Sequence, residues 1–129
     1  MSHGPREQAP ADISVVDSAV SIPDVCEVII TGPDEDWLVG FTRQLVTDRL
    51  AACGHHSQIR SVYAWEGRVH DEPETRLALH TRASLVPTIV ARTQQQHPYE
   101  VPCVLAVPIS QGNPDYQAWI VSVTDAPDA

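Results

Sequence analysis

Two adjacent histidines, His55 and His56, suggest metal chemistry, because imidazole is the commonest metal ligand among side chains. Neighbouring side chains point to opposite faces of a strand, so the two rings can share one ion only if they lie in a bend. His56 could instead meet His70 or His80 across a hairpin, where opposed residues lie about 5 Å apart. The alternative is that His55 and His56 are surface or turn residues that bind nothing.

Three cysteines, Cys26, Cys53 and Cys103, could supply thiol ligands. They cannot all pair within one chain, and no CxxC or CxxxC spacing indicates a zinc ribbon or a thioredoxin motif. Cys26 and Cys103 lie in apolar stretches, where a buried and inert thiol is the usual outcome. We expect Cys53 at the end of a helix, whose dipole would disfavour its thiolate. Cys103 is nevertheless the third candidate metal ligand, beside His55 and His56.

A second polar group consists of His97, Tyr99 and Glu100, and Pro98 and Pro102 flank the last two of these residues. The prolines make this segment a stiff connector into the last strand. The same connector places an imidazole and a carboxylate at one end of the sheet, where they could meet a cation. Trp65 and Glu66, at the tip of a predicted hairpin, could lie near the edge of a neighbouring subunit. These five residues are the candidates for lining a ligand cleft between subunits.

The bulk composition excludes several classes of function. The 129 residues carry 17 acidic and 8 basic side chains, a net charge of −9, whereas nucleic acids and anionic membranes bind basic surfaces. No stretch approaches the ~18 apolar residues of a membrane span. The sequence also lacks the GxSxG, HExxH, Walker and GxGxxG motifs. We therefore expect a binding protein rather than an enzyme, without an organic cofactor. Its unpaired thiols favour the reducing cytoplasm.

The hydrophobic pattern predicts the elements that must position these residues. A strand at 25–31 precedes a helix that Asp34 caps and that runs to Gly54, where the chain can reverse. There follow a hairpin at about 53–82, a helix at 84–96, a strand at 101–109 and a short helix at 115–121. The order β-α-β-β-α-β predicts a ferredoxin-like α+β sandwich with a short C-terminal helix. We assign this domain to residues 24–123, a flexible tail to 1–23 and a disordered C-terminus to 124–129.

The predicted hairpin is too long for the domain that carries it. Each arm has about a dozen residues and would span roughly 40 Å. A domain of ~100 residues has a radius of gyration of only ~13 Å. A hairpin of that length must extend beyond its own domain, so we expect other copies of the chain to cover it.

Four motifs resemble the CutA divalent-cation tolerance family: Arg49-Leu50-Ala51-Ala52-Cys53, Ser61-Val62-Tyr63-Ala64-Trp65-Glu66-Gly67-Arg68, His97-Pro98-Tyr99-Glu100-Val101-Pro102, and Gly112-Asn113-Pro114-Asp115-Tyr116-Gln117-Ala118-Trp119. The resemblance implies a ferredoxin-like homotrimer in which long hairpins wrap neighbouring subunits. It also implies a cytoplasmic protein that binds copper or another divalent ion and acts in metal tolerance. His80 stands where the family usually has a lysine, and the Gly54-His55-His56-Ser57 run replaces its usual apolar bend.

Two functional hypotheses follow. In the first, a trimer binds a divalent transition metal, with Cu²⁺ favoured by the affinity order, through imidazole and thiol ligands. The alternative is a signalling or regulatory trimer, similar to the PII proteins, that binds a small ligand or a partner protein in the clefts between subunits.

Overall fold

The computed structural model describes residues 24–125, so the tail predicted for 1–23 lies outside the described residues. The elements are β1 (Val25–Gly32), α1 (Glu35–Thr47), β2 (Cys53–Trp65), β3 (Arg68–Arg82), a 3₁₀ turn (Ala83–Leu85), α2 (Val86–Gln96), β4 (Val104–Pro108) and α3 (Pro114–Val123). This order confirms the βαββαβ prediction and the short C-terminal helix. None of the helices in this part of the chain is long and apolar enough to cross a membrane.

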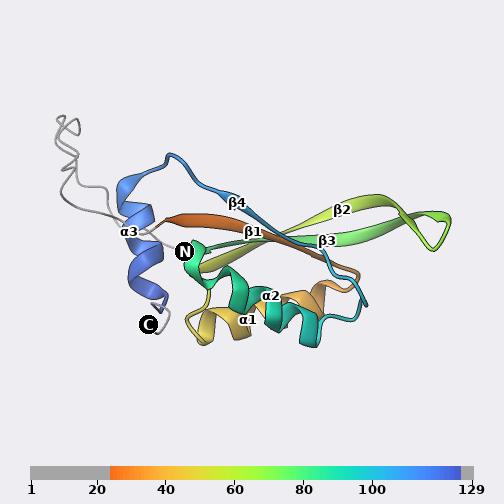
Figure 1. Cartoon of the computed structure of the whole chain (residues 1–129), viewed down its shortest axis with the longest axis horizontal. Coiled ribbons are helices and arrows are strands. Elements are labelled where there is room, and N and C mark those ends of the chain that lie inside the picture. Colours follow the sequence, from red (N-terminus) through yellow and green to blue (C-terminus); the bar gives the residue numbers. More distant parts are fainter. Residues whose placement is uncertain (1–23, 126–129) are drawn as a thin grey trace.

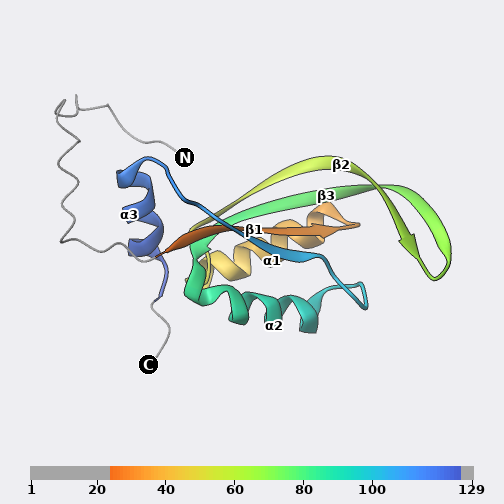
Figure 2. The same cartoon turned by 45° about the horizontal axis from the view of Figure 1, so that its top comes forward.

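The four strands form one antiparallel sheet in the order β2-β3-β1-β4. Helices α1 and α2 lie together against one face of this sheet (Figure 2). Helix α3 lies across one end of the sheet, and the hairpin of β2 and β3 extends from the opposite end (Figure 1). The predicted ferredoxin-like α+β sandwich is therefore confirmed. We call the sheet face opposite α1 and α2 the outer face.

The core lies between the sheet and the two helices because the strands alternate in polarity. Val28 and Ile30 of β1 and Leu79 of β3 point to the helices and are fully buried. Leu38 and Phe41 of α1 pack against these strand residues in the same cluster. The intervening strand residues point to the outer face, and this alternation decides which polar side chains meet there.

The turn after α1 differs from the prediction. The helix ends at Thr47, and the left-handed position belongs to Arg49, with a φ of 61°. Gly54 lies inside strand β2 instead of reversing the chain. A Cβ atom at Gly54 would approach the side chains of Thr42 and Leu77 to 2.6 and 2.7 Å, so the glycine allows β2 to lie close to α1 and β3.

Substitution of Gly54 by alanine is expected to destabilise the fold by about 1–3 kcal/mol, because the added methyl group overpacks two buried side chains. Gly40→Ala is the matched control. Gly40 lies in α1, where a Cβ atom meets nothing within 4 Å, so alanine should stabilise the helix by roughly 0.5–1 kcal/mol. Urea unfolding of both variants measures the difference. Equal stabilities would contradict the packing role of Gly54.

The hairpin extends well beyond the sheet. Strand β3 pairs with β1 only from Thr75 to Arg82, whereas it pairs with β2 from Arg68 to His80. Residues 68–74 therefore belong to a two-stranded ribbon, which extends the sheet by about 20 Å. At its tip, Glu66 and Gly67 both adopt positive φ angles, 51° and 76°, as a tight reversal requires.

The ordered domain extends two residues beyond the predicted boundary at 123. Thr124 is 1% exposed, and its hydroxyl donates to the carbonyl of Ile120 at 2.8 Å. The Arg82 guanidinium donates to the carbonyls of Val121 and Thr124 at 2.7 and 3.0 Å. Asp125 pairs with Arg49 at 2.6 Å. The prediction of disorder is wrong for Thr124 and Asp125, because these hydrogen bonds and this ion pair hold both residues to the domain. Residues 126–129 lie outside the described part.

Candidate metal centre

The pairing of β2 with β3 brings a thiol and two imidazoles together on the outer face. Cys53 lies directly opposite His80, and His55 is the next residue of β2 on the same face. One ligand atom from each of these three residues lies within 4.8 Å of the others. Within residues 24–125, no other group of three histidine, cysteine or acidic side chains offers ligand atoms this close together. Cys53, His55 and His80 are a candidate for binding a metal ion, and we call this group the metal site.

The spacing of these ligand atoms suits a transition metal. Cys53 Sγ lies 3.6 Å from His80 Nδ1. Two ligands of a tetrahedral metal, at the usual bond lengths of about 2.3 Å for sulfur and 2.1 Å for nitrogen, are separated by about 3.6 Å. The His55 ring lies beside that of His80, with 5.4 Å between the ring centroids. A thiolate with two imidazoles is a set that copper and zinc prefer.

Glu27 orients one of the two imidazoles. It lies opposite His80 across the β1–β3 pair, and its Oε2 atom is 2.9 Å from His80 Nε2. The carboxylate therefore accepts a hydrogen bond from the Nε2–H group, and Nδ1 is the ring nitrogen that faces Cys53. Metal-binding histidines commonly donate their second ring nitrogen to a carboxylate, which sets the tautomer and the orientation of the ring. Glu27 therefore stands where metal-binding histidines commonly have a carboxylate that orients the ring.

Helix α3 contributes a hydroxyl group to the same site. The Tyr116 hydroxyl lies 2.7 Å from His80 Nδ1 and 3.2 Å from Cys53 Sγ. Burial and the hydrogen bond to Cys53 raise the pKa of Tyr116, so the phenol keeps its proton. Tyr116 is therefore a neutral hydrogen-bonding partner of two residues of the metal site.

These contacts set the protonation behaviour of Cys53. Burial raises the pKa of its thiol, but the hydrogen bonds with His80 and Tyr116 outweigh burial and bring the pKa below the ordinary value. The hydrogen bond to Cys53 also raises the pKa of His80 above its ordinary value, against the effect of burial, and Glu27 adds to this. The prediction that a helix dipole disfavours the Cys53 thiolate is wrong, because α1 ends at Thr47 and Cys53 begins a strand.

Cys53 is expected to react with iodoacetamide faster than Cys26 at neutral pH. Thiolate is the reactive form, and burial of Cys26, which is 3% exposed, raises its pKa while hiding its sulfur. Alkylation for increasing times, followed by peptide mass spectrometry, measures both rates in one sample. His80→Asn should slow the reaction of Cys53, since it removes the hydrogen bond that favours the thiolate. Faster labelling of Cys26 would contradict this account.

Only His55 of the three predicted ligands belongs to the metal site. His56 follows it in β2 and points to the other face, where its Nε2 atom lies 3.0 Å from the Thr42 hydroxyl. Cys103 precedes β4 and lies outside the group. The set His55, His56 and Cys103 is therefore not assembled within the described chain. The predicted set left out Cys53, which was expected at a helix end, and His80, which was considered only as a partner of His56 across the hairpin. The register of the hairpin is what brings these two residues together.

His97 does not offer a nitrogen to a cation. Its Nε2 atom donates to the carbonyl of Thr31 at 2.7 Å, and its Nδ1 atom accepts from the backbone N–H of Tyr99 at 2.9 Å. Its ring also packs edge-on against Trp37, with 5.1 Å between the centroids. Both nitrogens are therefore occupied, and His97 fastens the connector to the end of β1. In the described chain, neither ring nitrogen is left for the cation that was expected at this residue.

The other cleft candidates lie in two separate places, the connector before β4 and the tip of the hairpin. The Tyr99 hydroxyl donates to buried Glu74 at 2.9 Å, and burial, followed by this carboxylate, raises the pKa of Tyr99. Glu100 is exposed. Trp65 and Glu66 lie at the hairpin tip, on the order of 20 Å along the strands from Glu74. One copy of the described chain thus does not bring the five candidates together.

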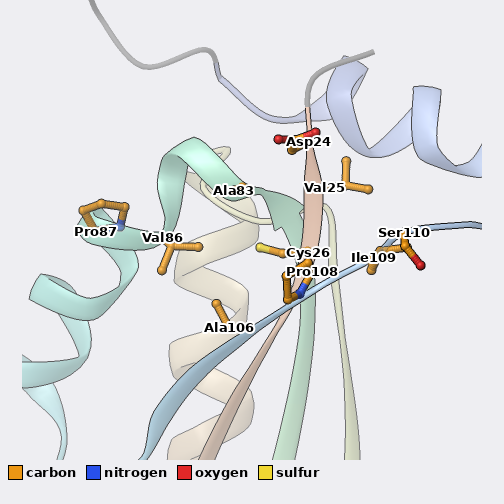
Figure 3. Close-up of a pocket in the computed structure, with 10 residues that line it drawn as sticks. All are labelled: Asp24, Val25, Cys26, Ala83, Val86, Pro87, Ala106, Pro108, Ile109 and Ser110. Atoms are coloured by element: carbon orange, nitrogen blue, oxygen red, sulfur yellow. The ribbon is translucent and has the colours of Figure 1, made fainter. Parts of the chain in front are cut away.

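A separate groove lies between β4 and the start of α2. It has a volume of about 610 Å³ and mostly apolar walls, with Cys26, Val86 and Pro108 among its lining residues (Figure 3). Cys26 belongs to the face of β1 that meets the helices. The groove is therefore on the opposite side of the sheet from the metal site.

Comparison with known proteins agrees with this architecture. Residues 26–123 match the family model described as CutA1 divalent ion tolerance protein. The chain is 38% identical over 103 residues to Protein CutA of Mus musculus, which covers 79% of this chain but only 58% of that relative. It is 30% identical to the divalent-cation tolerance protein CutA of Salmonella newport, over 84% of this chain and 95% of the relative.

Solved structures show the same fold. CutA1 from Oryza sativa superposes with a TM-score of 0.79 at 32% identity, covering 83% of this chain and all of that one. CutA from Xylella fastidiosa superposes with a TM-score of 0.76 at 35% identity, covering 79% and 99%. The family match includes every helix and strand from β1 to α3 except the first residue of β1. The chain therefore belongs to the CutA1 divalent ion tolerance protein family.

Proposed function

We propose that this protein binds a divalent transition-metal ion at the metal site and that this binding is its part in divalent ion tolerance. The observation that carries the proposal is the register of β2 and β3, which places Cys53, His55 and His80 on one face. Thiolate and imidazole ligands favour copper and zinc over magnesium and calcium, and Cu²⁺ stands highest in the affinity order.

Each residue has a defined part in binding. Cys53 supplies sulfur from a thiol whose pKa is already lowered, which reduces the proton competition that metal ligands face. His80 supplies Nδ1 while Glu27 holds its Nε2 proton. His55 is the exposed member of the group in one copy of the chain, so an ion would reach the group from its side. Binding would lower the concentration of free metal ion, and that effect would contribute to tolerance of the ion. We place this role in the cytoplasm, where reducing conditions keep the Cys53 thiol available.

We propose further that the protein is a homotrimer. The two-stranded ribbon of residues 59–74 extends past the sheet, and an isolated hairpin is marginally stable in water. On the outer face, Leu105 and Val107 of β4 are 63% and 51% exposed. The ribbon of one copy is stabilised when it packs against another surface, and the apolar outer face of the next copy is stabilised when it is buried. Their mutual burial in a closed ring supports a trimer.

Titration of Cu²⁺ and Zn²⁺ into the tag-free protein tests the metal proposal. We expect saturable binding with a dissociation constant below about 100 µM, or about −5.5 kcal/mol. His55→Ala should weaken binding at least about ten-fold, since loss of even an outer partner of a ligand commonly has an effect of that size. His56→Ala should leave the affinity unchanged, because the neighbouring side chain lies on the other face. Equal effects of the two substitutions, or no saturable binding, would refute the proposed site.

A further inference from the structure

Tyr116 contacts the metal site from a different element, the first turn of α3. Its hydroxyl lies within hydrogen-bonding distance of two of the three ligand atoms, His80 Nδ1 and Cys53 Sγ. We propose that the Tyr116 hydroxyl competes with the metal for His80, so that metal binding requires the Tyr116 side chain to withdraw. This inference rests on the proposed function and adds a residue that regulates the same site.

The competition follows from the bonding capacity of His80. An imidazole nitrogen has one bonding direction, in the plane of the ring, and uses it for one proton or one metal. Glu27 occupies the Nε2 side of His80 at 2.9 Å. Nδ1 is therefore the remaining ligand atom of this ring, and the Tyr116 hydroxyl already lies 2.7 Å from it. His80 can bind a metal through Nδ1 only when this hydrogen bond is broken.

Helix α3 can release the hydroxyl without leaving the domain. Its later turns are held by fully buried Ile120, which packs with Val25 and Ala52. The Arg82 guanidinium donates to the carbonyl of Val121, near the C-terminal end of the helix. Tyr116 is two residues after the first residue of α3, so its side chain can move while these anchors remain.

Trp119 provides a direct report of the movement. Its ring packs against that of Tyr116, with 5.5 Å between the centroids. The other two tryptophans are elsewhere: Trp37 stacks on Phe41, and Trp65 lies at the hairpin tip. Replacing both by phenylalanine leaves Trp119 as the single tryptophan of the chain. Its emission then reports on the surroundings of Tyr116.

The first test compares the Zn²⁺ affinity of the full chain with that of Tyr116→Phe by calorimetry. Zn²⁺ is the probe because it has no redox chemistry with the thiol. The substitution removes the competing hydrogen bonds but keeps the ring, so binding should become roughly 2- to 12-fold tighter, the value of one ordinary hydrogen bond. Tyr99→Phe is the matched control. It also removes the hydroxyl of a half-buried tyrosine, but one bonded to Glu74, and should not change the affinity.

The second test follows Trp119 emission during the same titration in the single-tryptophan background. Zn²⁺ should change the emission when Tyr116 is present, because the ring must move. It should have little effect in the Tyr116→Phe chain, where no hydroxyl has to leave. Circular dichroism and the mass of each assembly confirm that the variants fold alike.

The outcomes separate the competition from the function on which it rests. If the original chain binds Zn²⁺ through Cys53, His55 and His80 but Tyr116→Phe binds no tighter, the competition is refuted and the metal site stands. Weaker binding by Tyr116→Phe would refute the competition as well, because it would indicate that the Tyr116 hydroxyl itself binds the metal. If neither chain binds Zn²⁺ and the Cu²⁺ titration also shows no saturable binding, both proposals fail.

Discussion

Metal binding is expected to fall at least about 100-fold when Cys53→Ser and His80→Asn are combined. Changing a residue that merely orients a ligand costs about 10- to 100-fold in affinity, so removing two ligands should cost more. These substitutions leave His55 as the single member of the metal site. Isothermal titration with Zn²⁺ and Cu²⁺ measures the loss.

A matched double variant controls for the general effect of removing a cysteine and a histidine. Cys103→Ser with His56→Asn changes the same residue types outside the metal site. It should bind metal with the affinity of the original chain. Cys53 and His80 are half-buried rather than part of the core, so both double variants should fold, as circular dichroism can verify. Equal affinities of the two double variants would place the metal elsewhere.

Shortening the hairpin is expected to abolish the proposed trimer while the domain remains folded. Replacing residues 62–71 by Asn-Gly joins Ser61 to Glu72, which are directly paired, so the register is kept. The deletion removes most of the two-stranded ribbon but no member of the main buried cluster between the sheet and the helices. Sizing chromatography with light scattering should find a chain somewhat below the 14.1 kDa of the full protein, instead of an assembly of three copies.

A tip variant of unchanged length is the control for this experiment. Replacing Glu66 by asparagine gives the Asn-Gly pair that tight hairpin turns favour, and both positions already have positive φ angles. This variant should assemble as the original chain does. A shortened hairpin that still forms a trimer, or an original chain that is a monomer, would refute the proposed role of the ribbon.

The metal site shows why sequence reasoning recovered some residues and not others. His55 was identified from its residue type, but its partner was sought in the adjacent His56, which the strand directs to the opposite face. Cys53 was set aside because a helix was expected to continue to Gly54. The helix ends earlier because Arg49 adopts a left-handed conformation, which is unusual for a residue other than glycine and is not visible in the pattern.

His97 illustrates the opposite error. Its place in a connector that prolines stiffen suggested a functional imidazole at the end of the sheet. The fold uses both of its nitrogens, one for the carbonyl of Thr31 and one for the N–H of Tyr99. A histidine that satisfies the backbone cannot be distinguished from a ligand by its residue type alone.

The sequence by itself determined the order of the elements, the ferredoxin-like sandwich and the long hairpin. These depend on local properties: the period of the apolar residues, the turn at Gly67 and the length of each arm. It also carried four motifs of the family. The tertiary structure alone decided that Cys53 lies opposite His80, that Glu27 holds the outer nitrogen of that ring, and that α3 brings Tyr116 to the same point. Contacts between residues 27, 53, 80 and 116 depend on strand register and helix docking, and no short stretch of sequence contains that information.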